Sequence, residues 1–202
     1  MSRGEAVAPR KAVFLDRDGT VNVEKNYLHR VEDFTFIPGV PQAIRRLNDA
    51  GFLVVVVTNQ SGVARGYFEL DDVHRLHNHI GRLLISESAH IDGFFICPHH
   101  PEAGQGQWRK RCDCRKGEPG LLLQAAEQLN IDLHRSFMVG DKPADMDAGR
   151  RAGCTPLLVL TGYGAETAQS LDPSIGRYAS LVEAVDFILR QGGSECFPPR
   201  PT

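Results

Sequence analysis

Asp16 and Asp18 stand two positions apart, directly after the apolar run 12–15 and before a glycine. In an extended backbone such residues share a side, so both carboxylates point the same way. Two like charges this close repel each other unless a cation or a shared proton relieves them. One carboxylate can then act as nucleophile or metal ligand and the other as acid or base. For an isolated pair, the alternative is an aspartate that caps a turn at the end of a strand.

Polar and charged groups also follow other apolar runs. The run 53–57 ends in the segment 58–62, TNQSG, whose hydroxyls, amides and backbone N–H groups are suited to cradle a phosphate oxygen. Lys116 adds positive charge on a loop, and Asp141 follows the run 136–139. The carboxyl ends of parallel strands meet at one edge of a sheet, so these groups are expected to converge with the first two aspartates.

Three aspartates, a threonine and a lysine at one sheet edge describe a site for phosphoryl transfer. Magnesium prefers oxygen ligands in octahedral geometry and keeps several waters, which suits two carboxylates, a backbone carbonyl and a substrate phosphate. Catalysis of this kind depends mostly on positioning and on stabilisation of charge. The residue set therefore predicts a magnesium-assisted reaction at a phosphate group.

Short β-branched or aromatic runs alternate with stretches of helical period, which predicts βαβ units, a parallel sheet and an α/β fold. The predicted strands cover 12–15, 53–57, 93–96, 136–139 and 156–160. The predicted helices cover the segment from Val40 to a stop at Gly51, then 71–84, 119–129, 145–152 and 181–189. The segments 22–38 and 97–118 are expected to be long loops on the functional side of the sheet. We expect one domain over 1–192 and a flexible tail over 193–202.

Four segments, taken together, resemble the four motifs of the haloacid dehalogenase superfamily of phosphatases. They are FLDRDGT at 14–20, VVTNQSG at 56–62, Lys116, and VGDKPAD at 139–145. The resemblance covers about 12–159 and implies a three-layer Rossmann-like sandwich with a central, mostly parallel sheet. Only about forty residues separate the first two motifs, too few for a large cap domain, so loops are expected to grip the substrate.

The resemblance implies a role for each motif residue. Asp16 would attack phosphorus and become an aspartyl phosphate, and Asp18 would protonate the leaving alcohol and then activate water. Mg²⁺ would be held by Asp16, by the carbonyl of Asp18 and by Asp141. Thr58 and Lys116 would neutralise the oxygens of the transferring group. Two further aspartates at the start of the predicted helix 145–152 are interpreted as favourable charges near its N-terminus, with an outer shell of the site as the alternative.

Cys97 and His99, followed after twelve residues by Cys112 and Cys114, supply three thiolates and one imidazole. Two ligand pairs joined by a short loop suit tetrahedral Zn²⁺, and a full set of four ligands leaves no open position, which predicts a structural metal. Such a zinc-pinned loop would hold the adjacent cations against the phosphate site. The alternatives are a disulfide, free buried thiols, or His100 as the imidazole ligand.

Within the superfamily, this ligand pattern resembles the family of heptose bisphosphate and histidinol-phosphate phosphatases. The segment 61–66 follows the heptose pattern, which implies hydrolysis of the C7 phosphate of a heptose bisphosphate for lipopolysaccharide synthesis. Histidinol phosphate is the alternative substrate. The resemblance assigns substrate binding to Glu24, Lys25, Asn26, Tyr27, Asn59, Gln60, Ser61, Arg115 and Lys142.

Composition narrows the remaining classes. The 202 residues carry a formal charge of −2, which does not favour a nucleic-acid or membrane-surface partner and weighs against a phosphatase of nucleic-acid ends. The longest apolar run, 52–57, is far shorter than the ~20 residues of a membrane-spanning helix. We expect a cytoplasmic monomer. A non-catalytic, zinc-stabilised interaction module is the alternative from another class, but it leaves the set of motif residues unexplained.

Three histidines, His74, His77 and His79, lie on the predicted helix 71–84. Their spacing scatters them around the helix among arginines. They are interpreted as part of a solvated face, with a set of ligands as the alternative.

Overall fold

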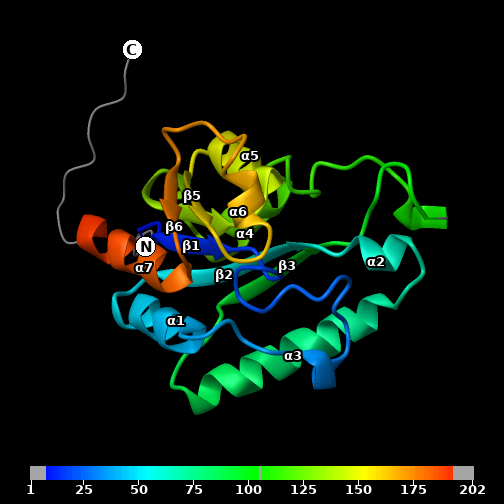
Figure 1. Ribbon diagram of the computed structural model, residues 1–202, viewed down its shortest axis with the longest axis horizontal. Helices are drawn as coiled ribbons and strands as arrows, with labels where there is room; N and C mark the ends of the chain where they lie inside the picture. Colours follow the sequence, from blue (N-terminus) through cyan, green and yellow to red (C-terminus); the bar gives the residue numbers. More distant parts are fainter. Residues whose placement is uncertain (1–7, 105, 193–202) are drawn as a thin grey trace, which may run out of the picture.

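The computed structural model describes residues 8–104 and 106–192 (Figure 1). Within these residues, six strands form one sheet, every neighbouring pair is parallel, and the order is β3-β2-β1-β4-β5-β6. The predicted parallel sheet is confirmed. The strands are β1 (Ala12–Leu15), β2 (Leu53–Asn59), β3 (Gly93–Cys97), β4 (Phe137–Gly140), β5 (Thr155–Val159) and β6 (Gly176–Tyr178).

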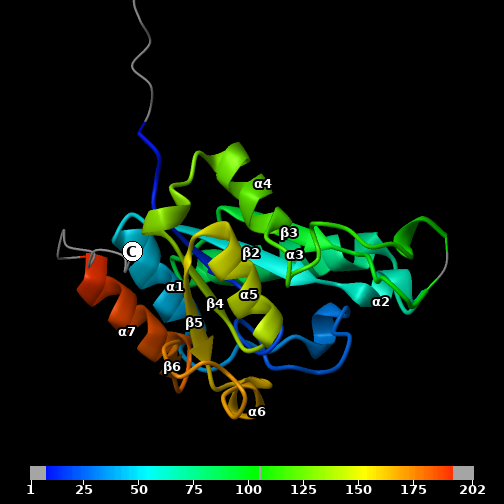
Figure 2. The same ribbon diagram turned by 90° about the horizontal axis from the view of Figure 1, so that it is seen from above.

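Helices connect the strands and cover both faces of the sheet. The α-helices are α1 (Val40–Asp49), α2 (Ser61–Ala64), α3 (Leu70–Ser86), α4 (Gly120–Leu129), α5 (Pro143–Ala152), α6 (Gly164–Thr167) and α7 (Leu181–Gly192). Short 3-10 helices occur at η1 (Val31–Asp33), η2 (Gly106–Trp108) and η3 (Leu133–Arg135). One face packs on α1, α3 and α7, and the other on α4 and α5 (Figures 1 and 2), which confirms the three-layer sandwich.

The central strand β1 explains why the sandwich has two cores. Val13 and Leu15 belong to the apolar cluster under α1, α3 and α7, whereas Ala12 and Phe14 belong to the cluster under α4 and α5. Side chains of a strand alternate between faces, so a strand that is apolar at every position must be covered on both sides. This packing fixes the position of β1 between the two helix layers, and therefore the position of the two aspartates that follow it.

Among the strands and α-helices, three were not predicted: β6, α2 and α6. Each has only three or four residues, too few to display a period of 2 or 3.6. The strands predicted at 136–139 and 156–160 are each displaced by one residue. Just before the start of β4, the side chain of Ser136 links two neighbouring segments. Its hydroxyl accepts the N–H of Ala12 at 2.9 Å and donates to the carbonyl of Asp132 at 2.6 Å.

The chain between β1 and β2 forms only η1, α1 and loops, so no large cap is present there, as predicted. The loop after β3 and the short helix α2 lie side by side at one end of the molecule (Figures 1 and 2). The tail predicted at 193–202 lies outside the described residues. Within the described ranges, no helix is both long and apolar enough to cross a membrane.

Candidate active site

The carboxyl ends of three adjacent strands bring the predicted groups together. Asp16 follows β1, Thr58 lies near the end of β2, and Asp141 follows β4, which pairs with β1 on the side opposite β2. Lys116 reaches the same place from the loop between β3 and α4. All four residues are buried. The edge of the sheet therefore holds a dense set of charged groups with little access to water.

Lys116 is clamped between two carboxylates. Its Nζ lies 2.5 Å from Oδ1 of Asp16 and 2.8 Å from Oδ1 of Asp145. Oxygens of Asp16, Asp141 and Asp145 all lie within 4.8 Å of one another. The Lys116 ammonium thus contacts two of three closely spaced carboxylates, and their negative charges outnumber the one positive charge in direct contact with them.

Burial and crowding act on these acids in the same direction. Burial raises the pKa of Asp16 to about 6, and repulsion from Asp145 adds to this, although Lys116 opposes it. Burial, followed by repulsion from Asp16, raises the pKa of Asp141 to about 7. Both carboxylates therefore resist ionisation unless another cation is present.

The donor set fits a magnesium ion. Oδ2 of Asp141 accepts the N–H of Tyr163 at 2.8 Å, but its buried Oδ1 has no hydrogen-bond partner in the part of the chain that is described. An unpaired buried carboxylate oxygen is costly, and a hard divalent cation would satisfy it. The backbone at Gly19 and Gly162 lies against the same carboxylate. A Cβ at either glycine would fall 2.2 Å from Oδ2, so larger residues would displace Asp141.

Asp145 lies in the first turn of α5, but its surroundings favour the outer-shell alternative over the interpretation as a favourable helix N-terminal charge alone. Asp145 is 1% exposed, pairs with Lys116, and accepts the N–H of Lys142 through Oδ2 at 3.0 Å. The first turn of α5 folds this side chain back over the end of β4, where Gly140 leaves room for it. Asp147 is exposed, in accordance with the simpler interpretation.

Asp18 lies beside the nucleophile candidate but in a different environment. Its carboxylate pairs with Arg17 at 2.8 Å and accepts hydrogen bonds from Asn22 and Gln60, each at 3.0 Å. Burial raises the pKa of Asp18, but Arg17 and then Asn22 outweigh burial, and the pKa is lowered overall. The surroundings of the two aspartates of the first motif thus shift their pKa values in opposite directions, upward for Asp16 and downward for Asp18.

A cavity of 580 Å³ opens beside Asp18 and Lys116. All the predicted substrate-binding residues line it except Lys25, whose exposed Nζ instead donates to the carbonyl of Asp33 at 2.5 Å. The prediction for Lys25 therefore does not match this cavity, because the side chain turns back along its own loop. The lining residues from the prediction are Glu24, Asn26, Tyr27, Asn59, Gln60, Ser61, Arg115 and Lys142.

Tyr163 also lines this cavity, and no sequence pattern pointed to it. Its ring lies 4.8 Å from the ammonium of Lys142, and its hydroxyl donates to Oδ1 of Asn26 at 3.3 Å. Lys142 in turn pairs with Glu24 at 3.1 Å. Side chains from three separate loops are thus joined along one wall of the cavity.

The cysteine and histidine pairs meet as one cluster. The Sγ of Cys97 lies 3.6 Å from that of Cys112, and the Sγ of Cys114 lies 3.3 Å from both Cys112 Sγ and His99 Nδ1. All three cysteines are free thiols. Hydrogen bonds, that from Cys97 first, lower the pKa of Cys114 to about 5. Four soft or borderline ligands at such separations suit tetrahedral zinc.

His100 lies outside this cluster. Its Nδ1 accepts the N–H groups of Glu102 and Ala103, and its Nε2 lies 3.4 Å from Arg65. Of the two adjacent histidines, the structure therefore brings only His99 to the cysteines.

The cluster of Cys97, His99, Cys112 and Cys114 is connected to Lys116 through two sets of hydrogen bonds. Nη1 of Arg115 donates to the carbonyl of His99 at 3.0 Å. The N–H of Lys116 donates to Oδ1 of Asn59 at 2.9 Å, and Nδ2 of Asn59 donates back to the Lys116 carbonyl at 3.3 Å. A rigid cluster would therefore hold this loop beside the end of β2 and fix the position of Lys116 in the site.

The solvated-face interpretation is wrong for one of the three histidines on α3. His74 is exposed and His79 partly exposed, but His77 is only 3% exposed and stacks on Phe94. The prediction was wrong because His77 lies on the buried face of α3 with Leu76 and Ile80. A hydrophobic residue is expected at such a position, so the polar side chain suggested an exposed one.

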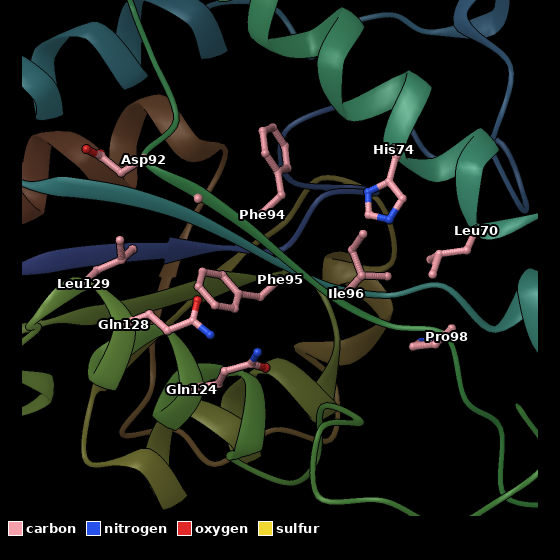
Figure 3. Close-up of a pocket in the computed structure, with 11 residues that line it drawn as sticks. Leu70, His74, Asp92, Phe94, Phe95, Ile96, Pro98, Gln124, Gln128 and Leu129 are labelled. Atoms are coloured by element: carbon pink, nitrogen blue, oxygen red, sulfur yellow. The ribbon is translucent and has the colours of Figure 1, made fainter. Parts of the chain in front are cut away.

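A second cavity, of 400 Å³, runs along the edge strand β3 between α3 and α4 (Figure 3). Phe94 and Phe95 point to opposite sides of the strand there (Figure 3). The one carboxylate that lines it, Asp92, already accepts the N–H of Val54 at 2.8 Å. This cavity contains no group of charges comparable to the site at the carboxyl ends of the strands.

Comparison with known proteins identifies the family to which this chain belongs. Residues 113–183 match the family model of HAD-hydrolase-like proteins. The chain is 45% identical to a D-glycero-beta-D-manno-heptose-1,7-bisphosphate 7-phosphatase of Haemophilus ducreyi, over 89% of this chain and 98% of the relative. It is 44% identical to the enzyme of that name from Escherichia coli, over 86% and 93% of the two chains.

Solved structures agree. The crystal structure of the D,D-heptose 1,7-bisphosphate phosphatase from B. bronchiseptica, complexed with magnesium and phosphate, superposes with a TM-score of 0.80 at 36% identity, covering 90% of this chain and 99% of that one. The corresponding enzyme from Burkholderia thailandensis gives a TM-score of 0.68 at 32% identity, over 89% and 99% of the two chains. With its carboxylate cluster, cavity and relatives in agreement, this chain belongs to the heptose 1,7-bisphosphate phosphatase family of haloacid dehalogenase-type phosphatases.

Proposed function

We propose that this protein hydrolyses the C7 phosphate of D-glycero-beta-D-manno-heptose 1,7-bisphosphate and releases heptose 1-phosphate and inorganic phosphate. The observation that carries the proposal is the junction of the buried Asp16–Lys116–Asp145 cluster with the polar cavity that opens beside Asp18. The relatives named above act, by their names, on this bisphosphate and at this position. In their pathway, the product would feed synthesis of nucleotide-activated heptose for lipopolysaccharide.

In the first step, a carboxylate oxygen of Asp16 attacks phosphorus. A new O–P bond forms, the bond between phosphorus and the C7 oxygen breaks, and Asp18 donates its proton to the departing alcohol. Lys116 and the hydroxyl of Thr58 would stabilise the oxygens of the transferring phosphoryl group. The product of this step is an aspartyl phosphate on Asp16 and heptose 1-phosphate.

In the second step, a water molecule attacks phosphorus of the aspartyl phosphate. Asp18, now ionised, takes a proton from that water, and the bond between phosphorus and Asp16 breaks. Inorganic phosphate leaves, and both aspartates return to their starting states. The lowered pKa of Asp18 suits its role as a base, whereas the leaving group requires it to be protonated when substrate is bound.

Asp16, the carbonyl of Asp18 and Asp141 would hold Mg²⁺. When bound, the cation would neutralise the repulsion between nucleophile and phosphate and polarise the phosphoryl group. The unpaired Oδ1 of Asp141 and the raised pKa of Asp16 support this assignment. The Cys97, His99, Cys112 and Cys114 ligands would hold Zn²⁺ in a structural role.

Arg115 and Lys142 would recognise the second phosphate or the sugar hydroxyls from the walls of the cavity. A guanidinium can hold phosphate through two parallel hydrogen bonds, which suits a substrate with one reacting and one recognised phosphate. Glu24, Asn26 and Tyr27, on the loop after β1, offer acceptors and an aromatic surface. We also propose that the protein acts as a cytoplasmic monomer and binds neither nucleic acid nor membrane.

The test compares phosphate release from heptose 1,7-bisphosphate, fructose 1,6-bisphosphate and histidinol phosphate, with Mg²⁺ and with chelator. We expect the heptose substrate to have a kcat/KM at least about 10-fold above either competitor, and chelator to abolish turnover. A preference for histidinol phosphate would overturn the substrate assignment. Hydrolysis that persists in chelator after dialysis would overturn the metal assignment.

A further inference from the structure

Arg17, between the two catalytic aspartates in sequence, has the largest completely buried side chain of the described residues. Its Nε and Nη2 both donate to Asp18, at distances between 2.8 and 3.2 Å. Nη2 also donates to the carbonyl of Leu28 at 2.8 Å. The Nε and Nη2 edge of the guanidinium therefore holds the carboxylate of Asp18. The hydrogen bond to the carbonyl of Leu28 holds this edge in place.

His77 faces the other side of the same guanidinium. Its Nε2 lies 3.4 Å from Nη1 of Arg17, and its ring stacks on Phe94 with 4.4 Å between the ring centroids and 19° between the planes. Arginine is always protonated and only donates, so His77 must be the acceptor and carry its proton on Nδ1. Burial, then the Arg17 charge, lower the pKa of His77 to about 3, which keeps this acceptor neutral at ordinary pH.

We propose that His77 is a positioning residue for the reaction, which acts through Arg17 to hold the Asp18 carboxyl at the wall of the cavity. The inference rests on the proposed function, since it takes Asp18 as the acid and base. Without the acceptor at Nη1, the guanidinium loses one of its three anchors, and the carboxylate that it grips is no longer fixed in direction. The stack on Phe94 sets the plane of the imidazole, so the acceptor points at Arg17.

A purely structural role for His77 predicts something different. His77 Nδ1 has no hydrogen-bond partner in the described part of the chain. A histidine that only filled space in the core would therefore be less favourable than an apolar residue. Phenylalanine would fill the same space between α3 and Phe94 without a buried unpaired nitrogen. If His77 only packs, His77→Phe keeps full activity.

The test uses the metal-loaded enzyme and two substrates that differ in their leaving group. The sugar alcohol needs a proton as it leaves, whereas the nitrophenolate of p-nitrophenyl phosphate does not. kcat/KM reports only the steps up to release of the alcohol, so it isolates the role of Asp18 as an acid. We expect His77→Phe to lower kcat/KM for heptose bisphosphate at least about 10-fold, and for p-nitrophenyl phosphate less than about 2-fold.

Two variants serve as controls. His77→Gln can again accept from Nη1 of Arg17 through its side-chain oxygen, and we expect it to restore most of the lost kcat/KM. His74→Gln changes the exposed histidine one turn earlier on α3 and should keep wild-type values. His77→Leu repeats the removal of the acceptor with a smaller side chain, in case phenylalanine does not fold.

The proposal is overturned if the apolar variants retain wild-type kcat/KM on the sugar, if both substrates lose activity equally, or if His77→Gln gives no rescue. Failure of the proposed function is distinguishable from this. If the wild-type protein does not hydrolyse heptose bisphosphate, the ratio between p-nitrophenyl phosphate and any alkyl phosphate that it does hydrolyse still decides the role of His77.

Discussion

Asp16 is the nucleophile of the proposed mechanism, and its buried charge is also electrostatically unfavourable. It is buried, bonded to Lys116 and repelled by Asp145 and Asp141, so its charge lowers stability unless a cation is bound. For an acid whose pKa is raised on folding, ionisation costs stability above the unfolded pKa, here from about pH 4 upward. Nucleophile strength and stability are therefore in conflict at this residue.

Asp16→Asn removes both the nucleophile and this cost. We expect turnover of heptose bisphosphate to fall at least about 10³-fold, since the covalent step is lost. In metal-free buffer at pH 7, the free energy of unfolding should stay equal or rise by on the order of 1 kcal/mol. Steady-state kinetics and chemical denaturation measure the two effects. A folded variant with wild-type turnover would contradict the assignment.

Asp145 tests the corrected interpretation of α5. Asp145→Asn keeps the shape but removes one of the two negative partners of Lys116, so the ammonium should shift toward Asp16 and weaken its attack. We expect kcat to fall about 10- to 100-fold. Asp147→Asn, two residues later and exposed, is the matched control and should retain wild-type kcat. Equal kcat for both variants would restore the interpretation of Asp145 as only a favourable charge near the N-terminus of α5.

The lowered pKa of His77 predicts how the free energy of unfolding changes with pH. Its folded pKa of about 3 lies below the ordinary value of 6.5, so below pH 6.5 the unfolded chain binds a proton that the folded chain does not. The free energy of unfolding should then fall by about 1 kcal/mol for each pH unit between 6.5 and 4 from this residue alone. His77→Phe should make the measured acid slope shallower by that amount. An unchanged slope would show that His77 is protonated in the folded protein.

At the scale of elements, the loop between β3 and α4 has few apolar residues of its own and depends on its Cys–His cluster. That cluster is joined to the site through Arg115 and through the reciprocal bonds of Lys116 with Asn59. A long loop with only one short 3-10 helix, η2, needs some other source of order, and a metal with four protein ligands would supply it.

Cys112→Ser removes one ligand of this cluster. We expect the wild-type protein, grown with zinc available, to hold about one equivalent of zinc and the variant less than half. kcat should fall together with zinc content, because the position of Lys116 is lost. Cys154→Ala, a buried cysteine outside the cluster, should keep its zinc. Metal analysis and kinetics on the same preparations decide, and a wild-type protein without zinc would refute the assignment.

Predictability differed between elements for physical reasons. β1, β2 and β4 were predicted to within two residues because strands covered on both faces are apolar throughout, and their polar ends stand out. Their parallel pairing then placed Asp16, Thr58 and Asp141 together without further information. The short elements β6, α2 and α6 have no period to detect.

The missed parts of the site have a different cause. Arg17 alternates with Asp16 and Asp18 along an extended backbone, so it had to point away from them, and sequence alone could not show that it folds back to grip Asp18. Asp145, Tyr163 and His77 come from helices and loops whose approach to the site is set by packing between distant segments. Local periodicity contains no information about such approaches.

At the scale of the whole molecule, the protein is a two-sided sandwich with its chemistry at one edge of the sheet. Aspartates and a threonine stand at the ends of three strands, the loop between β3 and α4 adds a lysine, and loops rather than a cap domain form the cavity. The cavity beside Asp18 is the route by which substrate and water would reach the site, whereas Asp16, Asp141 and Asp145 are themselves buried.

The most direct test asks whether phosphate becomes attached to Asp16. The metal-loaded enzyme is mixed with heptose bisphosphate, quenched during turnover and reduced with borohydride, which converts an aspartyl phosphate to homoserine. Mass spectrometry of the peptide that contains β1 then locates the change. We predict homoserine at position 16 and an unmodified Asp18. Modification at another residue, or none while phosphate is being released, would contradict the account.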